Sequence, residues 1–233
     1  MAERSSWLSH GPPDGDMLWM QPSHRSANIF RSRLRREKIL KVRRADSFFW
    51  VCMNDGRYCP PKVMGYIEKL GFHLASTIGH VKYDHHLVTT LDERWRPETH
   101  TFHFSMREAT ITLQDVEPDR SGTPILLSSI GAHVEMFLGA PPHSDIEAHN
   151  LSWSSTVLAY TYRGLCDSAL MNEKDFIGCG LLLQVWAWER IVKIRASFGP
   201  GVVPPMLLLL AAKWSKPLRK THVESNSLVA FKD

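Results

Sequence analysis

One stretch of the chain, if it forms a helix, is apolar on almost every side. It begins at residue 174 or 175, ends at about residue 195, and carries the apolar residues Leu181, Leu182, Leu183, Val185, Trp186, Trp188 and Ile191. A helix of this kind has to be covered around most of its circumference, which predicts that it lies at the centre of a core. The sequence therefore predicts a folded domain built around this helix.

Other segments have the apolar period of a helix or of a strand. Helices are expected at residues 60–71, from the candidate N-cap Asp84 to about Trp95, from about Ser154, and at residues 207–213. Residues 99–104 and 109–113 instead alternate and are rich in β-branched or aromatic side chains, which predicts one hairpin. We therefore expect a mainly α, compact helical domain with one small β-hairpin at about residues 99–113.

Length and composition indicate how the chain is organised. The 233 residues, of which 43% are hydrophobic, suffice to bury a core. Residues 1–24 are rich in Ser, Pro and Gly and are expected to form a flexible tail, and residues 25–233 a single domain. The most apolar tract, residues 206–212, is shorter than the about 20 residues of a membrane span. With no recognisable secretory signal, we expect a soluble intracellular protein without a membrane partner.

The positive charge of the chain is concentrated near its front. Residues 25–44 contain nine basic residues and one acid, a net charge of +8, whereas the whole chain carries +4. Apart from Arg25, the basic residues are the candidate nucleic-acid or import contacts Arg31, Arg33, Arg35, Arg36, Lys38, Lys41, Arg43 and Arg44. Such a charge pattern fits a nuclear-import signal or non-specific contact with DNA. It fits equally well an Arg-rich segment that is simply exposed to solvent.

Motifs for catalysis or metal binding are not recognisable in the sequence. The four cysteines form no C-x-x-C pair, and the neighbouring histidines are spaced so that they diverge, which favours ordinary histidines over a metal site. The motifs G-x-S-x-G, G-x-x-x-x-G-K-[ST] and G-x-G-x-x-G do not occur either. We therefore expect no metal, no cofactor and no enzymatic activity.

The most distinctive run of the chain begins at Glu93. It reads Glu93-Arg94-Trp95-Arg96-Pro97-Glu98-Thr99-His100-Thr101-Phe102-His103-Phe104 and continues through Glu108-Ala109-Thr110-Ile111-Thr112-Leu113-Gln114-Asp115-Val116. Physically it is a helix end, a turn containing proline and a hairpin, with Arg and Trp side chains suited to stacking. The run resembles the signature of the plant mobile domain, also called the aminotransferase-like plant mobile domain. This domain occurs in MAIN-like proteins, in long-form homologues of serine/threonine-protein phosphatase 7 and in plant transposable elements.

Further blocks match the same family in order. They are residues 42–50, 71–72, 158–166 and 178–190, so that the resemblance covers most of residues 18–233. Two departures accompany the match. An apolar helix expected after Val116 is replaced by a Pro- and Gly-containing sequence, and the long downstream region of full-length members is missing. A shortened domain is therefore expected, altered around residues 117–150 and truncated at its C-terminus.

The resemblance implies a nuclear plant protein linked to meristem maintenance, cell division and genome stability or transposon silencing. No established catalytic activity comes with it, and neither a pyridoxal phosphate constellation nor the metal-binding blocks of a two-metal phosphatase are found here. We expect contacts with nuclear proteins or chromatin, and the candidate family-motif surface comprises Arg94, Trp95, Arg96, His100 and His103.

Alternatives to these interpretations stay open. Arg94, Trp95 and Arg96 fit a helix end packed on the hairpin at least as well as a surface. For the function, the alternative is a transposon-derived fragment or a vestigial enzyme. The vestigial enzyme would use His100 with His103, or Glu98 with Glu108.

Overall fold

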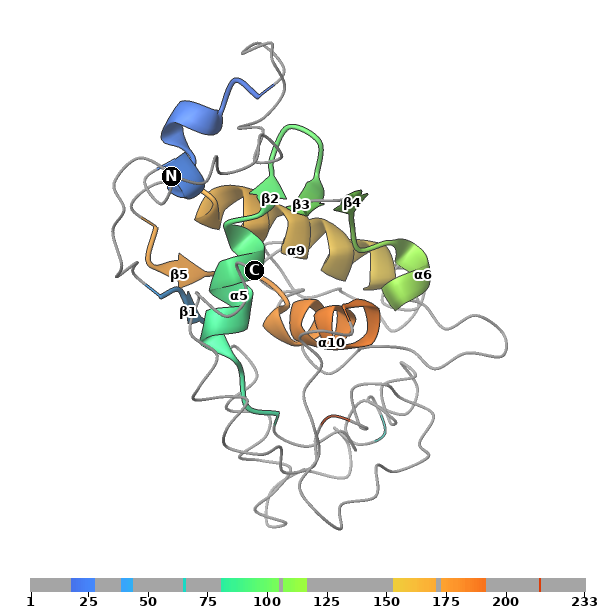
Figure 1. The fold of residues 1–233 in the computed structure, drawn as a ribbon. Coiled ribbons are helices and arrows are strands. Elements are labelled where there is room, and N and C mark those ends of the chain that lie inside the picture. The colour runs from blue at the N-terminus through green and yellow to red at the C-terminus, as the bar shows by residue number, and fades with distance from the viewer. Residues whose placement is uncertain are drawn as a thin grey trace, which may run out of the picture.

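The computed structural model describes residues 18–27, 39–43, 65, 81–104, 107–116, 153–170, 173–191 and 214. Within them lie the 3-10 helix η1 (Gln21–Ser23), the helices α5 (His85–Asp92), α6 (Leu113–Val116), α9 (Trp153–Ser168) and α10 (Gly180–Arg190), and the strands β1 (Lys41–Val42), β2 (Trp95–Arg96), β3 (Thr101–Phe104), β4 (Arg107–Ala109) and β5 (Asp175–Phe176). In the view of Figure 1, α9 runs between the strands β2, β3 and β4 above it and α10 below it.

Helix α10 lies at the centre of the core, as its sequence predicts. Every residue from its start at Gly180 to Trp188 is buried. The helix begins later than expected, because Asp175 and Phe176 form strand β5 instead of its first turn. Gly180 is required at the start of α10, since a Cβ there would lie 2.4 Å from Cγ1 of Val42 on strand β1.

Helix α5 begins where the sequence predicts. The side chain of Asp84 accepts a hydrogen bond from the backbone N–H of Leu87, which satisfies one of the donors that a helix start leaves without a partner. The helix ends at Asp92, three residues before Trp95, and Trp95 itself belongs to strand β2. The apolar residues Leu87, Val88 and Leu91 are buried in the same core cluster as Trp95.

The expected mainly α fold with one hairpin is wrong. The hairpin is present, as strands β3 and β4, but β2 pairs antiparallel with β3 and extends it to three strands in the order β2-β3-β4. A second, parallel pair joins β1 to β5. Helices make up 52% and strands 17% of the described residues. The described part of the chain therefore mixes helices with two small sheets.

Helix α5 takes the place of a third strand beside β1. One edge of β1 pairs with β5, with Lys41 opposite Asp175 and Val42 opposite Phe176. On the other side, the N–H of Leu40 donates to Thr89 Oγ1 (3.0 Å) and the N–H of Val42 donates to His85 Nδ1 (3.2 Å). Two side chains of α5 thus accept the N–H groups that an edge strand otherwise leaves unpaired.

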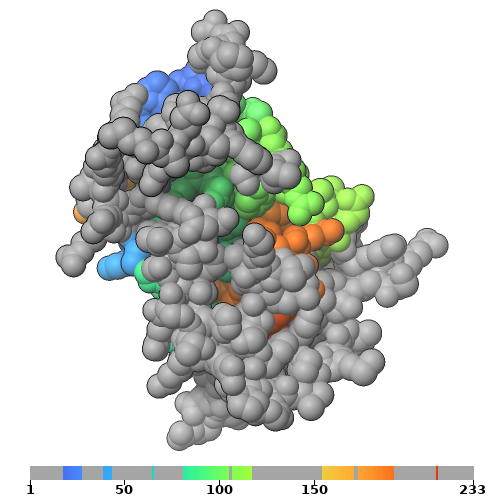
Figure 2. Space-filling model, viewed as in Figure 1, coloured from blue at the N-terminus to red at the C-terminus, as the bar shows by residue number. Residues whose placement is uncertain are grey.

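The signature run ends in a single turn of helix. Asp115 Oδ2 accepts hydrogen bonds from both the N–H and the hydroxyl of Thr112, and these two contacts cap the start of α6. Asp115 Oδ1 also accepts from the guanidinium of Arg190 at the end of α10. The short helix therefore ties the run to the central helix, and Figure 2 shows the two side by side on the surface, in light green and orange.

Several predictions lie mostly outside the described residues. Of the helix expected at residues 60–71 only Gly65 is described, and it is helical. The region of residues 117–150 and the helix expected at residues 207–213 are not described. Beyond residue 191 the described residue is Trp214, which is buried, lies against Trp188 at 5.0 Å between ring centroids and donates from Nε1 to Glu189 (2.9 Å).

Candidate functional site: the signature run and the segment docked on it

Trp95 is a core residue and not part of an exposed surface. Its side chain is fully buried, with its ring 4.8 Å from that of Phe102 in an edge-on contact and 5.0 Å from that of Tyr162. Its indole N–H points to Cys166 Sγ at 3.4 Å. Trp95 thus joins strand β2 to β3 and to helix α9, which is the packing role that was the alternative to a contact surface.

The two arginines beside Trp95 are half-buried. Arg94 lies over the ring of Phe104, 5.8 Å from its centroid, in a cation–π contact. Arg96 donates from Nη1 to the hydroxyl of Ser26 (3.3 Å), and its buried Nε has no hydrogen-bond partner among the described residues. Burial lowers the pKa of both guanidinium groups, while Glu93 counteracts this for Arg94 and Glu98 counteracts it for Arg96.

His100 and His103 lie in different settings. His100 is exposed, adopts a positive φ of 52° in the turn before β3, and stacks on Tyr162 with 5.7 Å between ring centroids. His103 lies within β3 opposite Glu108 of β4, and its Nε2 lies 2.6 Å from a Glu108 oxygen. The structure therefore gives each histidine a partner of its own.

The two carboxylates named for a vestigial enzyme also have separate partners. Glu98 accepts a hydrogen bond from the backbone N–H of Met20 (2.8 Å). Glu108 accepts one from the hydroxyl of Thr101 (3.0 Å) in addition to its contact with His103. Within the described ranges, no group of three or more His, Cys, Asp or Glu residues is placed to hold a metal ion.

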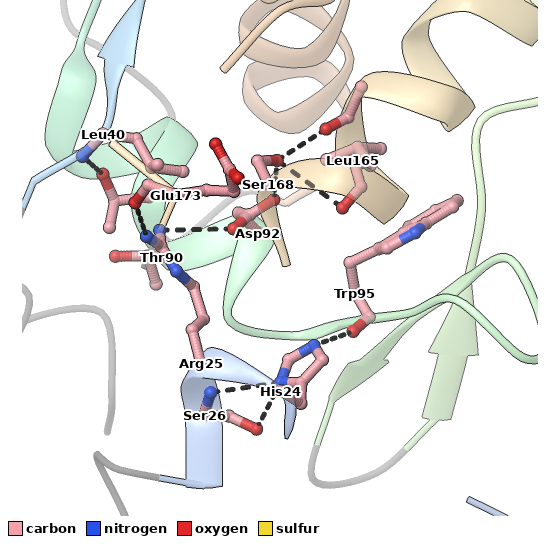
Figure 3. A network of polar contacts seen from close by, with 12 residues as sticks. His24, Arg25, Ser26, Leu40, Thr90, Asp92, Trp95, Leu165, Ser168 and Glu173 are labelled. Atoms are coloured by element: carbon pink, nitrogen blue, oxygen red, sulfur yellow. Dashed lines mark hydrogen bonds and ion pairs between the residues drawn. The ribbon is translucent and has the colours of Figure 1, made fainter. Parts of the chain in front are cut away.

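Residues 18–27, here called the N-terminal strap, dock on the signature run. Sequence reasoning placed residues 18–24 at the end of a flexible tail, yet Leu18 and His24 are buried. The Nε2 of His24 lies 2.8 Å from the carbonyl oxygen of Trp95. Figure 3 shows the imidazole between Ser26 and the Trp95 backbone.

Next to His24, Arg25 reaches a fully buried carboxylate. Its Nη1 lies 3.3 Å from Asp92 Oδ2 at the end of α5, and its Nη2 donates to the carbonyl oxygen of Glu173 (3.1 Å). The hydroxyl of Ser168 donates to the other oxygen of Asp92 (2.5 Å). Burial raises the pKa of Asp92 to about 7, although Arg25 and the Ser168 hydroxyl both act to lower it.

Sequence reasoning missed this buried cluster of His24, Arg25, Asp92 and Ser168. Arg25 was counted with the basic segment of residues 25–44, and Asp92 lies within the helix predicted from Asp84 to about Trp95. No local pattern identifies either residue as buried, because Arg25 and Asp92 are about as far apart in the chain as His24 and Trp95, which are 71 residues apart. The one signal in the sequence was this predicted helix, which places Asp92 near its C-terminal end.

The basic segment itself is described at its end. Lys41 is exposed in strand β1, and Arg43 pairs with Asp175 at 2.7 Å while 68% of its side chain stays accessible to solvent. The other candidate contacts lie outside the described residues: Arg31, Arg33, Arg35, Arg36, Lys38 and Arg44. Arg25, which pairs with Asp92, contributes to the core and not to the exposed charge.

Comparison with known proteins confirms the resemblance. The Plant mobile domain family matches residues 71–118 and 144–232, more than half of the chain. The chain belongs to this family. A plant mobile domain relative in Arabidopsis thaliana, Protein MAIN-LIKE 1, is 30% identical over 85% of the chain and 52% of its own length. The Serine/threonine-protein phosphatase 7 long form homolog of the same plant is 25% identical over 97% of the chain and 22% of its own length.

A third relative matches a shorter stretch of the chain at a higher identity. The Protein MAINTENANCE OF MERISTEMS of Arabidopsis thaliana is 46% identical over 22% of this plant mobile domain chain and 10% of its own length. The chain thus spans from a tenth to about half of these relatives. No solved structure matches it significantly. None of the described helices is both long enough and apolar enough for a membrane crossing.

Proposed function

We propose that this plant mobile domain chain is a non-enzymatic nuclear protein of the MAIN-like class that acts through contacts with proteins or chromatin. Family membership and the names of the relatives support this class. The observation that carries the proposal is the burial of Trp95 at the centre of the signature run. A signature residue that holds β2, β3 and α9 together serves the fold, and this leaves recognition to the exposed charges.

The basic segment is the proposed contact. Lys41 lies in strand β1 and Arg43 directly follows it, and both keep their charged groups at the surface. Electrostatic contact with phosphates needs exposed Lys and Arg side chains and depends strongly on salt concentration. The same segment, read by an import receptor, would account for nuclear residence.

Salt-titrated binding to duplex DNA tests the chromatin part of the proposal. Replacing Arg31, Arg33, Arg35 and Arg36 by Ser should weaken binding and reduce the slope of log K against log salt by about 3 to 4, because up to four phosphate contacts are lost. The matched control replaces four exposed cations elsewhere by Ser: Lys82, Arg107, Arg163 and Lys174. Equal losses in both variants, or no binding at low salt, would reject a DNA contact at this segment.

Nuclear accumulation is tested separately. A reporter protein fused to residues 20–50 should enter plant nuclei, and the same fusion with the four Arg→Ser changes should not. A reporter that stays in the cytoplasm with the unchanged segment would contradict the import signal. The proposed link to meristem maintenance, cell division and genome stability is then tested by asking whether the Arg→Ser chain rescues a plant that lacks the protein.

A further inference from the structure

The N-terminal strap is held on the rest of the molecule by a small set of contacts. The backbone N–H of Arg25 donates to the carbonyl oxygen of Ala169 (2.7 Å), and that of Met20 donates to Glu98 (2.8 Å). His24 forms an isolated antiparallel bridge with Leu170. Figure 2 shows the blue atoms of the strap at the outside of the molecule in this view.

Both ring nitrogens of His24 contact groups of the docked structure. Nε2 faces the carbonyl oxygen of Trp95, which can only accept, so Nε2 carries the proton. Nδ1 is then an acceptor, and it faces the backbone N–H of Ser26 (3.1 Å), the hydroxyl of Ser26 (2.7 Å) and Nη1 of Arg96 (3.5 Å). The Ser26 hydroxyl oxygen already accepts from Gln21 Nε2 (3.2 Å) and Arg96 Nη1 (3.3 Å), so its own O–H is left to donate to Nδ1. The docked geometry therefore favours a neutral imidazole.

We propose that the strap is a releasable, acid-sensitive latch: a second proton on His24 places an N–H donor against the donors of Ser26 and Arg96, and the strap leaves the signature run. Release opens the Trp95 carbonyl, the Arg96 guanidinium and the Glu98 carboxylate to solvent. The latch thus controls access to polar groups of the family signature.

The electrostatic surroundings of His24 act in the same direction. The pKa of His24 is lowered from 6.5 to about 4. Burial is the largest cause, the charges of Arg96 on β2 and of the neighbouring Arg25 act in the same direction, and the hydrogen bond to the Trp95 carbonyl acts against them. Because the docked imidazole has the lower pKa, docking is fully favoured above pH 6.5. It is lost progressively as the pH falls towards 4.

The other ionisable groups at the strap are Asp92 and Glu98. Glu98 accepts from the Met20 backbone, and Asp92 pairs with Arg25. Because burial raises the pKa of Asp92 to about 7, that carboxyl takes up its proton at a higher pH than His24 does. The pH at which the strap is released therefore identifies the group that controls it.

The size of the effect follows from the pKa of His24. A difference of about 2.5 units between the released and the docked imidazole changes the docking equilibrium by up to tenfold per pH unit. Between pH 7 and 4 the population of the released strap should therefore rise by about 100-fold, because half of the docked imidazoles are themselves protonated at pH 4.

Hydrogen exchange of the full chain tests the latch. Protection of the Met20, Arg25 and Ser26 amides, corrected for intrinsic exchange, should fall about tenfold per pH unit below pH 6, while protection in α10 stays constant. His24→Gln keeps a donor for the Trp95 carbonyl and does not titrate, so its protection should not depend on pH. His103→Gln, on the hairpin, is the matched control and should respond like the unchanged chain.

Several results would overturn the proposal. One is a strap whose protection is constant from pH 7 to 4.5, a second is a response centred near pH 7 that points to Asp92, and a third is a His24→Gln chain with an unchanged response. If His24→Gln docks too weakly to be measured, an NMR titration of the His24 ring in the unchanged chain decides. A ring that titrates near 6.5 while the strap amides stay protected contradicts the latch.

Discussion

Gly164 marks the closest approach of α9 to the chain that leads into α10. A Cβ at this position would lie 2.3 Å from the carbonyl oxygen of Ile177 and 2.8 Å from its carbon. Both are backbone atoms, so neither can rotate away as the end of a flexible side chain would. The contact requires a glycine for its lack of a side chain and not for its dihedral freedom.

Substitution of this glycine should therefore be costly. Gly164→Ala is expected to lower the free energy of unfolding by about 2–3 kcal/mol, since α9 and the segment after β5 have to separate. The matched control is Gly65→Ala, where a Cβ meets no atom of the described residues within 4 Å and the helical position favours Ala by up to about 1 kcal/mol. Urea unfolding of both variants measures the difference, and equal midpoints would contradict the close approach.

At the scale of single residues, the sequence predicts what is local. The Asp84 cap was predicted because it joins two residues three apart, a spacing that the helix start itself dictates. The positions of His24 and Arg25 were not predicted, because their partners Trp95 and Asp92 are brought to them by the fold. A charge count near the front of the chain cannot distinguish a buried arginine from an exposed one.

Side chains of helix α5 accept hydrogen bonds from backbone N–H groups at strand β1. The hydroxyl of Thr89 donates to the carbonyl of His85 (2.6 Å) and accepts from the N–H of Leu40 (3.0 Å). The neighbouring Thr90 donates in the same way to the carbonyl of His86 (2.9 Å). Both threonines are buried. Within the described part of the chain, the difference between them is that the Thr89 hydroxyl also accepts a hydrogen bond from a backbone N–H that flanks β1, that of Leu40.

This difference predicts unequal effects of the same substitution. Thr89→Val should lower the free energy of unfolding by about 1–3 kcal/mol, because the buried N–H of Leu40 loses its acceptor. Thr90→Val removes a hydroxyl that bonds within its own helix and should cost less than about 1 kcal/mol. Denaturant unfolding compares the two, and a Thr90→Val chain that is the less stable would refute the role of α5 as a substitute strand.

At the scale of elements, helices were predictable and most strands were not. The helices α5, α9 and α10 have apolar periods long enough to recognise, although α10 begins later than expected and α5 and α10 both end earlier. Strands β1, β2 and β5 have two residues each, too few to show alternation. Their pairings join distant residues, such as Lys41 with Asp175. Apart from the β3–β4 hairpin, neither sheet was therefore predicted from the sequence.

The folded unit is larger than the segment that defines the family. The family match begins at residue 71, yet the strap and β1 lie before it and contribute buried residues to the structure, among them Leu40 and Val42 in the main core cluster. Without them Phe176 loses its partner strand and Asp92 loses Arg25. A buried carboxylate without its partner is strongly destabilising.

A chain that begins at residue 71 should therefore fail to fold cooperatively. We expect a broad thermal transition without a defined Tm, whereas the full chain should unfold in one step. A synthetic peptide of residues 18–43, added to the shortened chain, should restore part of the transition, while a peptide of the same composition in scrambled order should not. A sharp transition in the shortened chain alone would mean that the family segment is an independent domain.

At the scale of the whole molecule, the sequence identified the family but not the architecture. The signature run was recognisable because its residue types are distinctive, and the comparisons confirm the family. The same run did not reveal that Trp95 is buried, because a contact surface and a core can use the same aromatic residue. Burial depends on the strap, on α9 and on the hairpin together.

The parallel pair of β1 with β5 has a consequence for protein synthesis. Arg43, next to β1, and its partner Asp175 are 132 residues apart, so a ribosome that adds 5–20 residues per second needs on the order of ten seconds to deliver the second strand. During that time Leu40 and Val42 have no β5 to cover them. The newly made front of the chain therefore depends on α5, which is translated earlier, or on a chaperone, to keep it from aggregating.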